Sequence, residues 1–426
     1  MKKIIFGAMA AAALLACSKE QVIEQNRAND EIGFSVVAEN QTKAADVYAS
    51  NHKMEGFSVA ATYNNSWYFQ KDTIVYQNPA WVNKTATRYW SVDGTHDFYA
   101  IANGTMTLAG ATDKPKVVDF TPATTVADQK DLLYAVAADK QKSNDPVTLN
   151  FRHALSQIQF KAKNTNSKLY VKISGVQVGQ AYGKGTFTYP LTSTTEEDVV
   201  GDWTDYDTPT NYTLTFSPVA VAGNSTNPES VALTCTNEKS MLLIPATTEA
   251  WVPERGEGTE GPGGGGEWGD GGADEGTEGG TGGGEWGDGG DDDGVYPEPG
   301  GESGDEGDGG EFSMRRYNTA SASASDVTGS YLAVKCQIYN VAGDKYDDKN
   351  DVCLYNGWAM IPAGFKWEQG KKYIYTFVFG EGDFGYNGGN GDNPTPGGEK
   401  VLTSMNYTVK VDDFTDVETE KNMETL

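Results

Sequence analysis

The sequence predicts an all-β protein built from β-sandwich domains, and three features support this class. Apolar residues recur with a period of two along many short segments, as they do in half-buried strands. Gly, Asn, Asp and Thr cluster between these segments and supply turns. No segment carries a sustained helical repeat of apolar residues. Short strands separated by such turns are typical of sandwiches.

The first predicted strand begins at Ile32. Its core-facing side chains share one parity: Ile32, Phe34, Val36 and Ala38. Further strands of the first half are expected at 56–62, 66–70, 86–92, 97–102, 116–120, 147–163, 169–178 and 185–189. The apolar face reverses between Leu155 and Ile158, and one extra residue reverses every later side chain, so we expect a bulge or a corner there.

A second domain is expected to follow the first at residue 201. The predicted domains are 31–200 and 201–426, and the strands of the second lie at 211–216, 230–236, 240–245, 330–339 and 352–361. The two clearest stripes of the chain come last. They are Tyr373, Tyr375, Phe377 and Phe379, followed by Val401, Thr403, Met405, Tyr407, Val409 and Val411.

The N-terminus predicts an exported lipoprotein. Lys2 and Lys3 precede an apolar run over 4–15 that is too short to cross a bilayer core of ~30 Å as a helix. Leu14-Leu15-Ala16-Cys17 matches the lipobox of bacterial lipoproteins. We therefore expect a signal peptide over 1–16, lipid on Cys17, and a tether over 17–30 that leads from the outer membrane. An ordinary secretory signal with a chance cysteine is the alternative.

A low-complexity insert over 252–312 interrupts the second domain. Between residues 254 and 311 it holds nineteen Asp and Glu and one Arg, a net charge of −18 out of −27, and 26 of the 51 Gly. Such a chain buries too little apolar area to offset its ordering entropy, so we predict that it is disordered.

The insert contains one repeated segment, GGGEWGDGG, at 264–272 and 282–290. The repeat places Trp268 and Trp286 at equivalent positions, which makes them candidate adhesive aromatics, since aromatic anchors concentrate binding energy. A solvated spacer on the protein surface is the alternative interpretation.

The sequence offers no rigid catalytic constellation. His52, His96 and His153 lie outside metal-ligand spacing of one another and of any Cys, so no metal site is expected, and His153 is interpreted as a core or corner histidine. No G-x-S-x-G, H-E-x-x-H or P-loop motif is present. We predict a protein that is not an enzyme and has no cofactor. Its acidity also argues against a nucleic-acid partner.

The cysteines predict no disulfide framework. With Cys17 assigned to lipid, three remain, which allows at most one disulfide. Cys235 and Cys336 share the parity of apolar neighbours and are expected to be buried thiols, whereas Cys353 lies off the apolar face.

Several pieces of the chain, taken in order, resemble the fimbrillins, the subunits of type V pili, and the broader fimbrillin-like lipoproteins. They are IGFS at 32–35, TKA at 42–44, DLLYA at 131–135, LNFRHALSQI at 149–158, MLLIP at 241–245, IPAG at 361–364, WEQGKKY at 367–373 and DDFTD at 412–416. The resemblance covers most of the mature chain apart from the insert.

This resemblance implies two transthyretin-like Greek-key β-sandwich domains and a processing step. In the family a protease cuts after a basic residue and removes the lipid anchor with the first strand. Carried onto this chain, the cut falls between Lys43 and Ala44, where the best-known members have Arg before the cut. The displaced strand would carry Ile32, Phe34 and Val36.

Loss of that strand would leave unpaired backbone groups beside an apolar groove, which accepts a foreign strand. The stripe with Met405, Tyr407, Val409 and Val411 is the candidate donor, and repeated head-to-tail exchange gives an open filament. We therefore predict a structural subunit of an adhesive pilus at the cell surface. Its expected partners are other pilus subunits, the outer membrane and a surface receptor of a host or bacterial cell. The alternative is a monomeric or anchoring outer-membrane lipoprotein with a binding β-sandwich.

Overall fold

The structure is a computed structural model that describes residues 30–38, 54–195, 198–234, 240–253, 328–343, 345–395 and 397–413. These residues belong to one compact unit. In the described ranges the chain forms seventeen strands and one short 3-10 helix, η1 (Val126–Asp128). The predicted all-β class is thus confirmed. Greek-key connectivity stays a prediction, and the insert lies outside the described residues apart from its first two positions.

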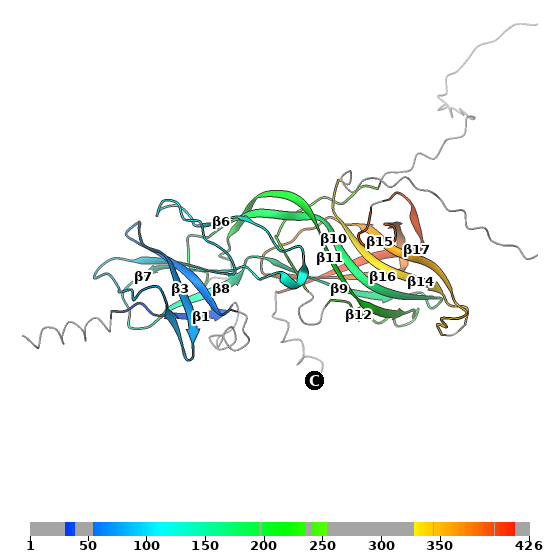
Figure 1. The fold of residues 1–426 in the computed structure, drawn as a ribbon, viewed down its shortest axis with the longest axis horizontal. Coiled ribbons are helices and arrows are strands. Elements are labelled where there is room, and N and C mark those ends of the chain that lie inside the picture. Colours follow the sequence, from blue (N-terminus) through cyan, green and yellow to red (C-terminus); the bar gives the residue numbers. More distant parts are fainter. Residues whose placement is uncertain are drawn as a thin grey trace, which may run out of the picture. The chain divides into compact units, whose positions relative to one another are not determined.

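Seven strands form a closed ring in the order β1-β4-β3-β2-β5-β7-β8, drawn from blue to blue-green in Figure 1. Their bounds are β1 (Phe34–Ala38), β2 (Gly56–Tyr63), β3 (Ser66–Gln77), β4 (Ala80–Asn83), β5 (His96–Ala102), β7 (Leu133–Lys140) and β8 (Val147–His153). Side chains from different walls meet inside the ring. Phe34 contacts Phe98 at a centroid distance of 5.7 Å, and Phe57 contacts Phe151 at 5.2 Å.

The chain leaves the ring at a corner. β8 ends at His153, and after the two intervening residues Ala154 and Leu155, β9 (Ser156–Asn164) begins in the second sheet, parallel to β16 (Lys371–Asn387). This confirms the corner expected between Leu155 and Ile158. The sheet therefore changes well before residue 200, where the boundary between the two domains is predicted; that boundary itself stays a prediction.

The second sheet has the order β11-β10-β14-β15-β16-β9-β12, with β13, β17 and β6 attached at its sides. Its remaining strands are coloured from cyan for β6 to red for β17 in Figure 1. They are β6 (Lys116–Phe120), β10 (Leu169–Thr188), β11 (Asp202–Ala222), β12 (Val231–Ala232), β13 (Met241–Leu243), β14 (Tyr331–Asn340), β15 (Val352–Pro362) and β17 (Lys400–Asp413). The apolar stripe of β16 packs inward as predicted. The ring of Phe377, for example, stacks on that of Phe160 at 5.7 Å.

β11 forms one edge of this sheet and is irregular. The register between β10 and β11 shifts at three places. Asp205 and Thr208 have positive φ angles of 52° and 55°, which few non-glycine residues adopt. Pro209 and Pro218 lie on the same strand and have no backbone N–H to offer. Bulges and prolines of this kind are how natural sheets protect an edge.

Segment 86–92 is not a strand, contrary to the prediction. It contributes one antiparallel bridge, between Tyr89 and Glu31, and two backbone hydrogen bonds to the residues in front of β1. Its alternation of polar and apolar residues reflects packing beside the first strand, because Trp90 is buried in the ring core while Tyr89 is 38% exposed.

Candidate functional site

The first strand is attached unequally to its two neighbours. β1 pairs in parallel with β8 over five positions, from Phe34 opposite Val147 to Ala38 opposite Phe151. With β4 it shares one pair, Phe34 opposite Trp81. β1 thus closes the ring along β8 and contributes little backbone pairing on its other side.

The residues in front of β1 are tied down by segment 88–90. The Ile32 N–H donates to the carbonyl of Arg88 at 2.8 Å, and the Trp90 N–H donates to the carbonyl of Asp30 at 2.7 Å. The ammonium of Lys142 also contacts the carboxylate of Asp30. These contacts hold the first strand in the ring in addition to its own backbone pairing.

The predicted displaced residues lie together in the ring core. Ile32, Phe34 and Val36 are 3%, 5% and 0% exposed. The ring of Phe34 meets those of Phe57 and Phe98 edge to face at 6.3 and 5.7 Å. Burial of each such side chain is worth on the order of 2 kcal/mol. Removing the strand would therefore open an apolar groove along β8.

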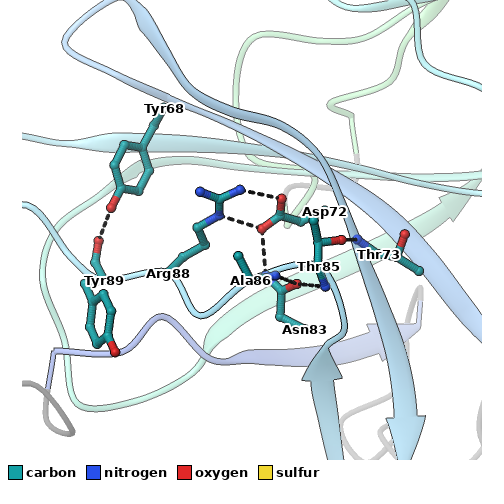
Figure 2. A network of polar contacts seen from close by, with 8 residues as sticks. All are labelled: Tyr68, Asp72, Thr73, Asn83, Thr85, Ala86, Arg88 and Tyr89. Atoms are coloured by element: carbon teal, nitrogen blue, oxygen red, sulfur yellow. Dashed lines mark hydrogen bonds and ion pairs between the residues drawn. The ribbon is translucent and has the colours of Figure 1, made fainter.

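A polar network fixes the segment that holds the first strand (Figure 2). Arg88 donates from Nε to Asp72 Oδ2 at 2.7 Å and from Nη2 to Oδ1 at 2.9 Å. Asn83 Nδ2 donates to Asp72 Oδ2 at 2.7 Å. The Oδ1 of Asn83 then accepts the N–H groups of Thr85 and Ala86 at 2.9 and 3.2 Å. Asp72 therefore connects β3 to the turn after β4 and to Arg88.

The charge state of this network follows from its contacts. Burial alone would raise the pKa of Asp72, but hydrogen bonds from Arg88 and Asn83 and the charge of Arg88 outweigh it and lower that pKa. The hydrogen bond to Asp72 likewise raises the pKa of Arg88. The guanidinium also lies 4.9 Å from the ring centroid of Phe69. The ion pair keeps the Arg88 backbone in place to accept Ile32.

Two indole N–H groups beside the first strand lack acceptors. Trp81 and Trp90 belong to the same core cluster as Ile32, Phe34 and Val36, and both Nε1 atoms are buried without a hydrogen-bond partner. A buried, unsatisfied donor costs about 1–3 kcal/mol. The groove therefore retains hydrogen-bonding capacity that β1, with Phe34 opposite Trp81, does not use.

On its other side, β8 is joined to β7 by two residue pairs, Leu133 with His153 and Tyr134 with Arg152. Beyond them Thr194, from the connection between β10 and β11, lies between the two strands. Its hydroxyl donates to the carbonyl of Asn150 at 2.7 Å and accepts the Val136 N–H at 3.1 Å. Thr194 thus acts as a bridge that holds β8 to the ring from the side away from β1.

The candidate donor strand lies at a sheet edge. Among the described strands, the residues of β17 pair with β16 alone, with Tyr407 opposite Phe377. Met405 is 1% exposed and Tyr407 is half-buried. Val409 and Val411 are 49% and 52% exposed although they share the parity of Met405. The C-terminal half of β17 is therefore held by backbone pairing more than by its side chains.

The two histidines within the described ranges, His96 and His153, have structural roles. His153 is buried at the corner with its Nδ1 against a carboxylate oxygen of Asp131, which confirms its interpretation as a corner histidine. His96 is buried as well, and burial lowers its pKa. His52 lies outside the described residues. In the described ranges no group of three or more His, Cys, Asp and Glu could hold a metal ion.

The comparison with known families supports one assignment. The family model described as fimbrillin-like matches residues 21–254, more than half of the chain. This chain belongs to the fimbrillin-like family. No curated protein matches it.

One solved structure shares the fold of this fimbrillin-like chain, and a second was found with a lower TM-score. A fimbrial protein from Bacteroides vulgatus is similar over 91% of this chain and 100% of its own, at 13% identity and a TM-score of 0.50. A proposed cell adhesion protein from Parabacteroides distasonis covers 90% of this chain and 98% of its own, at 9% identity and a TM-score of 0.40. At such identities the likeness bears on the fold alone.

Several predicted site residues of the fimbrillin-like chain lie outside the described residues: Cys17, Lys43, Ala44, Trp268 and Trp286. Of the other cysteines, Cys336 is buried as expected and Cys353 is exposed. Burial raises the pKa of the Cys336 thiol. Cys235 is also outside the described part. No helix within that part is long and apolar enough to cross a bilayer.

The two flanks of the insert meet in the sheet. Ala250 and Ser330 form a parallel bridge. The Trp251 N–H donates to the Ser330 carbonyl at 2.8 Å, and the Ser330 N–H donates to the Glu249 carbonyl at 2.8 Å. Trp251 also packs its ring against Tyr331 and Tyr386. The described residues on the two sides of the insert, 249–251 and 330, therefore lie next to each other.

Sequence reasoning missed the groups that support the first strand. Arg88 lies 16 residues from Asp72, and Thr194 lies 58 residues from Val136. No motif spans such separations. The one local signal was Asp72 itself, a charged residue at the parity of Ile74 inside a strand, since a buried carboxylate requires a partner.

Proposed function

We propose that this fimbrillin-like chain is a structural subunit of an adhesive pilus at the cell surface, exported as a lipoprotein and assembled by strand exchange after N-terminal processing. The observation that carries the proposal is the way the first strand is held in the ring. Its segment fills the ring core with Ile32, Phe34 and Val36, yet β1 pairs with β4 at one position. The fimbrial and cell-adhesion descriptions of structurally similar proteins support the same role.

The proposed route begins at the outer membrane. Lipid on Cys17 holds the chain there, and a protease then cuts between Lys43 and Ala44. The cut separates β1 from the chain that continues into β2. β1 is then held by its ladder with β8 and by the contacts of residues 30–32 with Arg88 and Trp90.

Departure of β1 exposes the backbone of β8 and the groove lined by Phe57, Phe98 and Trp81. Such an edge accepts a foreign strand, because main-chain hydrogen bonds give affinity and side-chain pockets give specificity. β17 of another copy supplies the strand through Met405, Tyr407, Val409 and Val411. Each copy then donates at one place and accepts at another, so that repetition yields an open filament.

The test of this route is intact-mass measurement and N-terminal sequencing of the protein taken from its native cell surface. We expect a mature N-terminus at Ala44 without lipid. A lipidated N-terminus at Cys17 in filaments would contradict the processing step.

A second candidate function is an anchored outer-membrane lipoprotein that keeps its own strand and binds a receptor with its β-sheet surfaces. The observation in its favour is that the intact chain has a complete ring, in which Val36 is fully buried. Electron microscopy of the native surface separates the two candidates. Filaments that contain this chain favour the pilus subunit, and a dispersed, lipidated monomer favours the anchored protein.

The acidic insert has two candidate roles in this setting. It is either a solvated spacer on the pilus surface or an adhesive segment in which Trp268 and Trp286 contact the receptor. Substituting both tryptophans by Ser and measuring adhesion to host and bacterial cells distinguishes them, since a spacer keeps its binding unchanged.

A further inference from the structure

The sheet formed by β9, β16 and β17 has a second face, opposite the side that packs Phe377 into the core. In the parallel ladder of β9 and β16, Ile374 lies opposite Gln159, and Val378 lies opposite Lys163. Residues paired in this way point to the same side of a sheet. We call this side the outer face, and its members on β9 and β16 include Gln157, Gln159, Lys161, Lys163, Ile374 and Val378.

Much of the outer face is buried although it points away from the core. Gln157 and Gln159 are 3% and 2% exposed, and Ile374 and Val378 are 6% and 2% exposed. Neither Ile374 nor Val378 belongs to any of the core clusters that the described residues form. Contacts outside those clusters therefore bury this face.

Two buried oxygens on the outer face indicate what such a contact has to supply. The Oε1 atoms of Gln157 and Gln159 are buried, and neither accepts a hydrogen bond from the described residues. The Nε2 of Gln159 donates to Ser240 Oγ at 2.8 Å, which fixes the orientation of that amide. A buried acceptor without a donor is unfavourable. The face thus suits a segment that brings backbone N–H groups or hydroxyl groups to the two glutamines.

The outer face is also basic, in a chain whose net charge is −27. Lys161 and Lys163 lie on β9, and Lys410 of β17 lies opposite Ile374. Within the described ranges, neither Lys161 nor Lys163 forms an ion pair. Asp412, which shares the face, contacts Lys410 at 2.9 Å. This excess of lysine favours an acidic partner.

We propose that the acidic segment 414–426 of the same chain docks on the outer face. β17 ends at Asp413, which lies opposite Lys371 at the beginning of β16, so the segment starts beside this face. Its thirteen residues hold one lysine and four carboxylates, those of Asp416, Glu418, Glu420 and Glu424. The inference goes beyond the pilus role and does not depend on it.

The length of the segment is sufficient for this contact. Thirteen extended residues span up to about 45 Å. The outer face from residue 372 to residue 378 is about 20 Å long, at a rise of about 3.3 Å per residue. The segment can therefore run along the whole face.

The remaining residues of the segment match the face in chemistry. Phe414, Val417 and Met423 can pack on Ile374 and Val378. The hydroxyl groups of three threonines and the backbone N–H groups can donate to the two glutamines. Docking would also secure the end of β17, where the exposed valines at 409 and 411 add little packing.

A thiol at position 376 tests whether the segment covers the face. Thr376 lies between Ile374 and Val378 along the outer face and is half-buried, so Thr376→Cys changes the side-chain volume little. The rate at which a maleimide labels this position is measured in the full chain by peptide mass spectrometry. This readout separates the new thiol from the chain's other cysteines. We expect slow labelling.

Removing charge from the segment should expose the thiol. The Thr376→Cys chain that also carries Asp416→Asn, Glu418→Gln, Glu420→Gln and Glu424→Gln should be labelled about tenfold faster, because the attraction to the lysines is lost. A matched control removes the same charge from four exposed carboxylates elsewhere, by Asp202→Asn, Glu229→Gln, Asp348→Asn and Asp392→Asn. It should be labelled at the original rate. Equal rates in the two variants would overturn the proposal.

A charge exchange tests direct contact between the segment and β9. Lys161→Glu together with Lys163→Glu should speed labelling. Adding Glu418→Lys and Glu420→Lys should slow it again, since the attraction is restored with its signs reversed. A sheet that had merely been destabilised would not recover in this way. Fast labelling that persists in the exchanged chain would overturn the contact.

Two further measurements identify the occupant. A chain that ends at Asp413 should be labelled as fast as the variant without the four carboxylates, and slow labelling there would mean that another segment covers the face. The rate in the full chain should be independent of protein concentration. Labelling that slows as the concentration rises would assign the segment to a neighbouring copy and overturn docking within one chain. Filament formation is measured separately, so failure here leaves the pilus role standing.

Discussion

The guanidinium of Arg88 donates two hydrogen bonds to the carboxylate of Asp72, at 2.7 and 2.9 Å. The backbone carbonyl of the same arginine accepts a hydrogen bond from the N–H of Ile32. One residue therefore links a buried ion pair to the segment that enters the first strand. Because the Asp72 side chain is 2% exposed and that of Arg88 is 29% exposed, the pair is partly shielded from solvent.

Asp72→Asn should lower the free energy of unfolding of the full chain by about 2–3 kcal/mol, because it leaves a partly buried guanidinium without its counter-charge. Urea denaturation followed by tryptophan fluorescence measures the change. Asp207→Asn, which breaks the exposed contact between Lys184 and Asp207, serves as the control and should leave the unfolding midpoint unchanged. Equal effects of the two substitutions would contradict a special role for Asp72.

The same carboxylate predicts a pH dependence. The pKa of Asp72 is lowered from 3.8 in the folded chain, so the group contributes stability above pH 3.8 that is lost as the pH falls toward its folded pKa. The difference in unfolding free energy between the unsubstituted chain and Asp72→Asn should be constant from pH 7 to 5 and shrink below pH 3.8. Denaturation series at several pH values measure it. A difference that grows in acid would contradict this sign.

Thr194→Val should loosen β8. The substitution removes a hydroxyl that donates to Asn150 and accepts from Val136, and it costs about 1–3 kcal/mol because both backbone groups are left without that partner. Hydrogen exchange measured by mass spectrometry should show faster exchange in β7 and β8 than in β16. Ser193→Ala, which removes a single contact with the Ala138 N–H, should have a smaller effect.

Val409→Asp should block polymer formation while the monomer stays soluble. Val409 is 49% exposed in the intact chain, so the monomer tolerates a charge there, whereas the groove would bury it. Size-exclusion chromatography and electron microscopy measure the polymers. Lys410→Asp is the matched control, since Lys410 lies on the opposite face of the same strand, and it should polymerise normally. Long filaments from Val409→Asp would eliminate β17 as the donor.

Replacing residues 254–327 by a short Gly/Ser linker should leave the unfolding midpoint unchanged. Trp251 and Ser330 already lie within hydrogen-bonding distance, and closing a loop costs little more when it is long than when it is short. Denaturation measures stability, and adhesion to host and bacterial cells measures function. A large loss of stability would mean that the insert packs on the sheet.

The sequence predicted those strands that have one solvent-exposed face and one buried face. The period-two stripes that begin at Ile32 and Tyr373 correspond to β1 and β16. β7 escaped prediction as a strand because Leu133, Tyr134, Ala135 and Val136 are all buried, so no alternation exists. Only part of β11 was predicted, as a short strand at 211–216. Its first half was missed because it carries polar side chains and is held by backbone pairing to β10.

The candidate site could likewise be predicted in part. The apolar side chains of β1 and β17 were found by parity, because each set lies within one short segment. The bridge through Thr194 and the ion pair of Arg88 depend on segments that meet only after the ring has closed, and neither leaves a local pattern in the chain.

The irregular edge of β11 has a consequence for many copies held close together. Pro209, Pro218 and the residues with positive φ interrupt the row of N–H groups that a second sheet would need in order to join side by side. In the pilus proposed above, subunits would therefore lack a continuous lateral contact along this edge. Neighbouring filaments would not be expected to join side by side through β11.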